Sequence, residues 1–248
     1  MNKNTFFYKI IERTGKFILA VFTYLVEKFS KNTTENNPYS IKGLKELEIN
    51  YEDIYHELEK LLSENEMPGV DEFFTEQKPL VKNKSWRSFL LFIYGNELVD
   101  NTNQCPKTTE LLKNIHGMSS AMFSVLSAGQ SIPPHKGVYK GVYRVLLGLK
   151  IPPDSEELCY LQVEDKKMNW EKGKIMLFDD TKLHSAHNYT NQDRVVLFID
   201  VVRPLPFPLN ILNFILFYIL SNAPYIKEAV YNYKKFGNHK VRKFKIAF

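Results

Sequence analysis

The sequence predicts a mainly β protein with flanking helices, whose central part forms an antiparallel sandwich or barrel. Between residues 121 and 202 the chain is a series of short apolar runs interrupted by Gly, Pro, Asn and Asp. Short strands with frequent turns are typical of antiparallel β folds. The runs that we expect to be strands cover residues 121–126, 143–151, 159–163, 174–178 and 194–202.

The length of the chain favours one main domain with an appendage at each end. A chain of 248 residues can build one substantial core, and its 44% hydrophobic content excludes a mainly disordered protein. We expect an N-terminal apolar helix and polar linker over residues 1–40, the main domain over 41–204, and a C-terminal apolar helix and basic tail over 205–248. An amphipathic helix over 51–65 and a short helix over 108–115 should cover the core.

The apolar segments near the two termini, residues 17–26 and 209–220, are shorter than the roughly 20 residues that span a bilayer. Residues 17–26 follow basic residues, as a secretion signal does, but they lack the small-x-small cleavage site that a signal peptide needs. Two alternatives therefore stay open for each segment. The helix is buried against the protein, or it lies in a membrane surface.

The C-terminal tail concentrates the positive charge of a chain whose formal net charge is +5. Such a tail can recognise a negative surface, and the alternative is a solvated tail with no partner. We expect an anionic membrane surface, and no nucleic acid, as its partner. The only acidic residue among residues 227–245 is Glu228. The basic residues of this stretch are Lys227, Lys234, Lys235, Lys240, Arg242, Lys243 and Lys245.

Two cysteines, Cys105 and Cys159, lie far apart in the sequence and without CxxC spacing. This pattern indicates neither a disulfide framework nor a thiolate metal site. A reducing, cytoplasmic setting fits it best.

Two histidines are candidate metal ligands because each lies at the end of an expected strand. His135 follows Pro133 and Pro134, and His184 comes soon after the apolar run that ends at Phe178. Neutral imidazole binds iron(II) well, and an oxygenase must leave neighbouring coordination positions open, so two or three protein ligands are enough. An isolated histidine is more often an ordinary surface or core residue, so the surrounding residues must decide.

Two arginines open apolar strands that follow these histidines, Arg144 after the first and Arg194 after the second. The planar guanidinium group matches a carboxylate with two hydrogen bonds, as a small dicarboxylate such as 2-oxoglutarate requires. Inside an apolar strand such a charge must be paired. The alternative is a structural salt bridge to Asp179, Asp180 or Asp200.

Several motifs follow one another between about Ser85 and Pro204, and together they resemble one known family. In order they are Ser124, His135-Lys-Gly, Arg144-Val-Leu-Leu-Gly-Leu-Lys-Ile-Pro, Trp170-Glu-Lys-Gly-Lys, Phe178-Asp-Asp, His184, Asn188 and Arg194-Val-Val-Leu-Phe-Ile-Asp-Val-Val-Arg-Pro. The order and spacing resemble the aspartyl/asparaginyl β-hydroxylase family. Upstream, residues 86–95 and Cys105-Pro-Lys-Thr are similar to its bacterial lipid A 2-hydroxylase branch.

The resemblance implies a double-stranded β-helix, a jelly roll like that of the cupins, and an iron(II)- and 2-oxoglutarate-dependent dioxygenase. It implies that His135 and His184 bind the iron and leave room for dioxygen. It also implies that Arg194 and Ser124 bind the distal carboxylate of 2-oxoglutarate, with Arg144 helping at the metal end.

Two positions, Gly137 and Leu146, distinguish this site from those of most iron/2-oxoglutarate oxygenases and of the β-hydroxylase family. Most iron/2-oxoglutarate oxygenases carry an acid two residues after the first histidine, where this chain has Gly137, which agrees with the two-histidine site of the β-hydroxylase family. The family usually has a second histidine in the strand where this chain has Leu146, so Arg144 lacks that neighbour.

The residues around His184 have alternatives of their own. His187 could replace it as a ligand, but in an extended strand residues three apart point to opposite faces. Asp179 and Asp180 are expected to shape the turn before His184 or to bond to it. Trp170 is interpreted as an aromatic plug at a hairpin turn, with little functional weight.

The reaction expected from the resemblance is hydroxylation of a C–H bond while 2-oxoglutarate is converted into succinate. The favoured substrate is the acyl chain of a membrane lipid, at the cytoplasmic face of the membrane. The first alternative is β-hydroxylation of an Asp or Asn in a protein or peptide. The second is a non-catalytic jelly-roll binding module anchored at a membrane.

Overall fold

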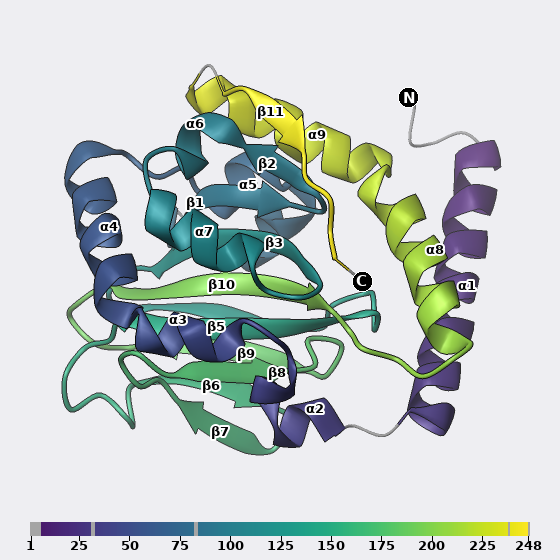
Figure 1. The fold of residues 1–248 in the computed structure, drawn as a ribbon, viewed down its shortest axis with the longest axis horizontal. Coiled ribbons are helices and arrows are strands. Elements are labelled where there is room, and N and C mark those ends of the chain that lie inside the picture. The colour runs from purple at the N-terminus through teal and green to yellow at the C-terminus, as the bar shows by residue number, and fades with distance from the viewer. Residues whose placement is uncertain (1–5, 31–32, 82–83, 238, 248) are drawn as a thin grey trace.

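Eight strands between Met118 and Val202 form the centre of the computed structural model, which describes residues 6–30, 33–81, 84–237 and 239–247 (Figure 1). The expected strands over 159–163 and 194–202 have the predicted bounds, and the three other expected strands shift by one to three residues at one end or both. The eight strands are β3 (Met118–Leu126), β4 (Gln130–His135), β5 (Val142–Lys150), β6 (Cys159–Val163), β7 (Lys166–Asn169), β8 (Ile175–Phe178), β9 (His184–Asn188) and β10 (Arg194–Val202).

These strands alternate between two facing sheets. The large sheet contains the order β3-β10-β5-β8, and the small sheet has the order β4-β9-β6-β7. All these neighbours are antiparallel, and the chain changes sheet at every step except the hairpin between β6 and β7. This winding is a double-stranded β-helix, so the predicted fold class is confirmed.

Three further strands extend the large sheet at its β3 edge. They are β1 (Trp86–Ile93), β2 (Asn96–Leu98) and β11 (Val241–Lys243), in the order β11-β2-β1-β3. The last of them lies in the segment expected to be a basic tail. Part of that tail is therefore sheet, and Arg242 pairs with the buried carboxylate of Glu97 at 2.9 Å.

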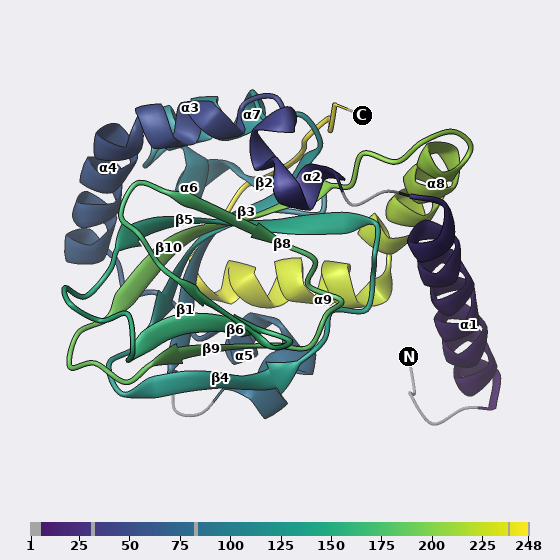
Figure 2. The same ribbon diagram turned by 90° about the horizontal axis from the view of Figure 1, so that it is seen from below.

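Helices cover the outer face of the large sheet, where α3 (Leu44–Ile49), α4 (Tyr51–Glu64) and α7 (Pro106–Lys113) contact its strands (Figure 2). The expected amphipathic helix is confirmed as α4, whose Ile54, Leu58 and Leu61 are buried in the core beneath it. A second core fills the space between the two sheets. The short helices are α2 (Thr33–Asn36), η1 (Pro38–Ser40), α5 (Val70–Phe73), η2 (Thr75–Leu80), α6 (Val99–Thr102) and η3 (Lys234–Phe236).

The terminal apolar segments form α1 (Phe6–Phe29) and α8 (Leu209–Ser221), and α9 (Pro224–Tyr233) follows the latter. α1 and α8 lie side by side at one end of the molecule (Figures 1 and 2). Phe22 and Val26 pack against Leu216, Phe217 and Tyr139, which buries one face of each helix and leaves the other face exposed. Residues 1–5 of the expected N-terminal helix and residues 31–32 of the expected linker lie outside the described residues.

No single helix in the described part of the chain is long and apolar enough to cross a membrane. Leu209–Ser221 and Pro224–Phe236 are long and apolar enough only when they are taken together, and the two helices are bent by 49° relative to each other.

Both cysteines are buried free thiols. Burial raises the pKa of Cys105, where Glu57 adds to the effect, and also that of Cys159, where Arg194 opposes it. Both side chains therefore stay protonated at neutral pH and act as small apolar core residues.

Gly148 lets two parts of the barrel approach closely. It lies on β5, and a Cβ atom added there would come within 2.1 Å of the carbonyl oxygen of Glu171. Backbone atoms cannot move aside as a flexible side chain can. We expect Gly148→Ala to lower the free energy of unfolding by about 1–3 kcal/mol, the usual cost of overpacking. Denaturant titration followed by circular dichroism measures this.

The matched control is Gly15→Ala on α1, where nothing lies within 4 Å of the added Cβ. Alanine is the better helix former, so this variant should be unchanged or more stable by up to about 1 kcal/mol. Equal stabilities of the two variants would contradict the close approach at Gly148.

Candidate active site

The two candidate metal ligands lie opposite each other because β4 pairs with β9. His135 is the register partner of His184, and their ring centroids are 4.2 Å apart. The register shifts between Ile132 and His135, where Pro133 and Pro134 supply no N–H groups to the sheet. This irregularity lies at the end of the strand, next to the imidazole of His135.

Backbone carbonyl groups fix the orientation of both rings. Nδ1 of His135 lies 2.8 Å from the carbonyl oxygen of Pro133, and Nδ1 of His184 lies 2.9 Å from that of Lys182. A ring nitrogen facing a carbonyl oxygen must carry the proton, so Nε2 of each ring keeps its lone pair. Burial lowers the pKa of His184 to about 3 and also lowers that of His135. Both rings are therefore neutral, as metal ligands must be.

One cavity inside the barrel brings together all five residues that the sequence singled out. His135, His184, Arg144, Arg194 and Ser124 all line it. Its remaining walls are almost entirely aliphatic and aromatic, with side chains from both sheets and from β1. They include Trp86, Leu146, Leu161, Trp170, Phe178 and Phe198.

Arg194 is a buried cation without a counter-charge in the described part of the chain. Its side chain is 3% exposed, its guanidinium carbon lies 4.8 Å from the ring centroid of Trp170, and its Nε has no hydrogen-bond partner among the described residues. Burial lowers its pKa to about 10. The alternative of a structural salt bridge therefore does not hold for Arg194. A buried charge is costly unless it is paired, so this arrangement favours binding of an anion.

Ser124 lies on β3, beside the strand that carries Arg194. The indole Nε1 of Trp86 donates a hydrogen bond of 2.9 Å to Oγ of Ser124. Because an indole N–H can only donate, the hydroxyl oxygen is the acceptor and its own proton remains available. Trp86 thus orients Ser124 as a donor toward a ligand in the cavity.

Arg144 has the structural salt bridges that Arg194 lacks. It contacts Asp180 at 3.0 Å and Asp200 at 3.0 Å, and its guanidinium group lies over the ring of Phe198 at 4.3 Å. Burial alone would lower its pKa, but the two carboxylates raise it. Arg144 is therefore a fixed positive charge in the cavity wall.

The carboxyl group of Asp180 occupies the space beside Gly137. A Cβ atom at position 137 would lie 2.3 Å from Oδ2 of Asp180, and the backbone N–H of Gly137 donates to the Asp180 carbonyl oxygen at 2.7 Å. Arg144 holds that carboxylate in place. A side chain at position 137 would therefore clash with Asp180 in this arrangement.

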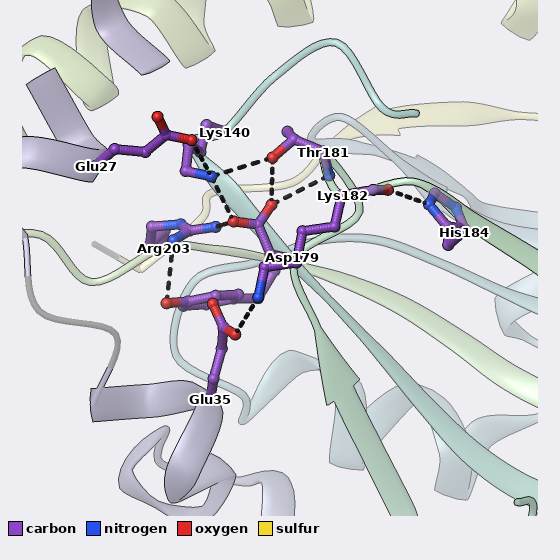
Figure 3. Close-up of polar contacts among 9 residues, drawn as sticks. Glu27, Glu35, Lys140, Asp179, Thr181, Lys182, His184 and Arg203 are labelled. Atoms are coloured by element: carbon purple, nitrogen blue, oxygen red, sulfur yellow. Dashed lines mark hydrogen bonds and ion pairs between the residues drawn. The ribbon is translucent and has the colours of Figure 1, made fainter. Parts of the chain in front are cut away.

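A second buried ionic cluster fixes the segment that leads to His184 (Figure 3). Asp179 contacts Lys140 at 2.9 Å and Arg203 at 2.6 Å, and it accepts hydrogen bonds from both the backbone and the hydroxyl of Thr181. Burial would raise the pKa of Asp179, but these partners lower it to about 2. The expected role of Asp179 in shaping this turn agrees with the geometry.

The N-terminal helices are attached to the same region (Figure 3). Glu27 of α1 contacts Lys140 at 3.0 Å, and Glu35 of α2 contacts Lys182 at 3.1 Å. Lys182 is also the residue whose carbonyl oxygen faces Nδ1 of His184. The helices that precede the barrel thus contact the segment that orients one candidate metal ligand.

His187 points away from the cavity. Its ring nitrogens lie 2.8 Å from Ser185 Oγ and 2.8 Å from the Tyr189 hydroxyl, and its ring stacks on Tyr160 at 4.7 Å. This placement agrees with the expectation that His184 and His187 face opposite sides of β9.

Two tryptophans contribute more to the site than their sequence context predicts. Trp170, interpreted as a plug at a turn, lies against the guanidinium group of Arg194. Trp86 orients Ser124, a contact that depends on the pairing of β1 with β3. Nothing local in the sequence links either tryptophan to its partner, although a tryptophan at the start of an apolar strand is a weak sign of a pocket wall.

The fold and site define a double-stranded β-helix protein with a two-histidine candidate metal centre and a buried, uncompensated arginine in one cavity, as far as the described residues show. The sequence profile of the family described as Aspartyl/Asparaginyl beta-hydroxylase matches residues 48–204, which is more than half of the chain. The chain belongs to this family. It is accordingly a hydroxylase by family, as the sequence motifs predicted.

Two relatives differ in how much of each protein the similarity covers. The chain is 37% identical over 191 residues to the ornithine lipid ester-linked acyl 2-hydroxylase of Rhizobium tropici, with 77% of this chain and 68% of that protein covered. It is 27% identical over 187 residues to the aspartyl/asparaginyl beta-hydroxylase of Mus musculus, with 67% of this chain covered. The match spans 24% of the mouse protein, so the chain corresponds to only part of it.

Two solved structures show a distant likeness to this chain. The Cupin_2 domain of an XRE family transcriptional regulator from Enterobacter cloacae has a TM-score of 0.34 and 11% identity, covering 48% of this chain and 99% of that one. KdgF from Halomonas sp. has a TM-score of 0.31 and 10% identity, covering 50% of this chain and 85% of that one.

We expect His135→Ala and His184→Ala each to weaken iron(II) binding by at least about tenfold, since even residues that only orient a metal ligand are worth 10- to 100-fold. Anaerobic isothermal titration calorimetry measures the affinity. The matched control is His187→Ala, which removes an imidazole from the opposite face of the same strand and should leave the affinity unchanged. Unchanged binding in either of the first two variants would refute the metal assignment.

Proposed function

We propose that the protein is an iron(II)- and 2-oxoglutarate-dependent dioxygenase that hydroxylates a C–H bond. The observation that carries this proposal is the content of one cavity: two neutral, carbonyl-oriented imidazoles together with a buried arginine that has no counter-charge among the described residues. The imidazoles suit a metal, and the arginine suits a carboxylate. Membership of a hydroxylase family supports the same reaction class.

The two histidines fit iron(II) in their donor chemistry. Nε2 of His135 and of His184 are the donor atoms left available once each Nδ1 faces a carbonyl oxygen. The described residues contain no cluster of three or more His, Cys, Asp or Glu side chains able to hold a metal, so protein ligands would leave several coordination positions open. When bound, iron(II) with dioxygen and 2-oxoglutarate supplies the oxidising power that puts one oxygen atom into the substrate and the other into succinate, with release of carbon dioxide.

Arg194 and Ser124 are assigned to the distal carboxylate of 2-oxoglutarate. The guanidinium group offers two parallel N–H donors, and the Ser124 hydroxyl, held by Trp86, offers a third. Trp170 covers the face of the guanidinium group and leaves its edge for the carboxylate. These contacts would bind and orient the co-substrate.

Arg144 is assigned to the metal end of the co-substrate. Asp180 and Asp200 hold its guanidinium group, so it presents a fixed charge beside the candidate ligands. Leu146, at the position where the family usually has a histidine, adds an apolar side chain to the same wall. The apolar walls would exclude water from the reacting C–H bond.

For the substrate we propose the acyl chain of a membrane lipid, at the cytoplasmic face of a membrane. Two apolar side chains near the candidate ligands in the sequence are exposed, namely Val138, three residues after His135, at 75% and Leu183, next to His184, at 46%. An acyl chain approaching the metal would bury such groups. The relative from Rhizobium tropici is named for acyl 2-hydroxylation of a lipid. The alternative, β-hydroxylation of an Asp or Asn residue, is supported by the name of the mouse relative.

We expect Arg194→Lys to raise the KM for 2-oxoglutarate by at least about tenfold, because one charge-assisted hydrogen bond worth about 1.5–3 kcal/mol is lost. Succinate formation at varied 2-oxoglutarate concentration measures it. The control is Arg242→Lys, whose arginine pairs with Glu97 outside the cavity and whose replacement should not change KM. Wild-type dependence on 2-oxoglutarate in Arg194→Lys would leave Arg194 with only a structural role.

Comparative mass spectrometry should identify the class of substrate. We expect cells that express the active protein to contain a lipid whose acyl chain is heavier by one oxygen atom. Cells that express His184→Ala at the same level should lack it, because the variant has lost a ligand. A mass gain confined to Asp or Asn residues of peptides would replace the lipid proposal by its alternative.

A further inference from the structure

One face of α8 is apolar although it is exposed. Ile211, Ile215, Tyr218 and Ile219 recur with the helical spacing of a single face, and Tyr218 is 65% exposed. The opposite face, which includes Leu216 and Phe217, is buried against the rest of the protein. The exposed face is therefore not needed to hold the helix in place.

A second exposed apolar row runs along α1. It consists of Phe17, Val21 and Tyr24, which also share one helix face, and Phe17 is 69% exposed. The other side of α1, with Phe22 and Val26, packs against α8, so the two exposed rows lie on adjacent helices (Figures 1 and 2). Exposed rows of large apolar side chains on two neighbouring helices are unusual for a soluble protein and indicate an interaction site. We refer to these two rows as the apolar face.

A basic groove begins where the apolar face ends. It encloses about 240 Å³ and is lined by Lys227 and Lys234 from the α9 region and by Lys243 of β11. Ser221, in the last turn of α8, also lines it and donates a hydrogen bond to the carbonyl oxygen of Tyr218. The groove and the apolar face thus meet at the C-terminal end of α8.

The charge of this groove is not neutralised by the protein. None of its three lysines forms an ion pair within the described ranges. Glu228, the acid next to Lys227 in the sequence, accepts a hydrogen bond from Thr75 at 3.3 Å instead. A groove of this size suits a phosphate-sized group and is too small for a whole lipid.

We propose that the apolar face and the basic groove together dock the protein on an anionic lipid bilayer. The apolar side chains would enter the interfacial region, and the three lysines would contact lipid phosphate groups. Both features are needed, because one shallow helix alone binds a membrane weakly. A second copy of the chain fits less well, since a twofold contact through this surface would bring two sets of unpaired lysines together.

The docking helices also contact the candidate active site. Tyr139, four residues after His135, stacks on Phe22 of α1 at 5.8 Å and donates a hydrogen bond of 3.0 Å to the carbonyl oxygen of Asn213 in α8. The loop that leaves the first candidate ligand is therefore held by the two helices that would meet the bilayer. This role in substrate access rests on the proposed function, whereas the docking itself does not.

The test is co-sedimentation of the iron-free full chain with vesicles of phosphatidylcholine alone or mixed with phosphatidylglycerol, at low and high salt. We expect binding to the anionic vesicles, weakened by salt. The triple variant Lys227→Gln, Lys234→Gln, Lys243→Gln should bind about a hundredfold more weakly, from about fivefold per lysine. Ile215→Ser with Tyr218→Ser should bind more weakly at both salt concentrations.

The matched control neutralises three exposed lysines that lie outside α1, α8 and the basic groove, Lys45→Gln, Lys60→Gln and Lys172→Gln, and should bind like the wild type. Equal losses in the two triple variants would overturn the assignment of the groove. Failure of the folded wild-type chain to sediment with anionic vesicles at low salt would overturn the docking proposal. So would a dimer that the Ile215→Ser, Tyr218→Ser variant abolishes in the absence of any vesicle binding. Succinate formation in detergent-dispersed lipid, measured separately, reports on the proposed reaction whatever the vesicles show.

Discussion

The pairing of β4 with β9 is the constraint on which the site depends. It places His135 opposite His184 at the end of the small sheet, and the adjoining carbonyl groups then select which nitrogen of each ring is available. The prolines before His135 end the regular pairing at that point. A shift of one residue in this register would turn one ring out of the barrel, because successive side chains of a strand face opposite sides. The fold therefore supplies the geometry, and few residues are needed to supply the chemistry.

Charge balance inside the barrel separates two arginines that have acidic partners from one that has none among the described residues. Arg144 and Arg203 are neutralised by neighbouring aspartates, and these pairs hold the segments around the cavity in place. Arg194, equally buried, lies against an aromatic ring and has no acid beside it within the described residues. The desolvation of this charge is unfavourable, and the proposed binding of a carboxylate would offset it. The paired arginines thus stabilise the fold around the cavity, and the unpaired one is the candidate for recognising a ligand.

Much of this could be predicted from the sequence, and each exception has a physical cause. Five strands between Met118 and Val202 were predicted from their apolar runs, although β1, which is equally apolar, was not. The motifs identified the five candidate site residues, all of which line the cavity together with apolar side chains. The strand β9 is rich in polar residues and β4 contains two prolines, so neither has the apolar pattern of a strand. The contact of Trp86 with Ser124 and the pairing of β11 with β2 join distant segments. Only the tertiary fold brings such partners together, and no local pattern encodes them.

The burial of both cysteine side chains protects them from oxidation. The iron- and dioxygen-dependent reaction proposed above would expose the protein to reactive oxygen species. Thiolates are the forms that oxidise readily, and burial keeps Cys105 and Cys159 protonated and out of contact with solvent. The chain thus holds no exposed thiol among its described residues that could form sulfenic acid or cross-link two copies.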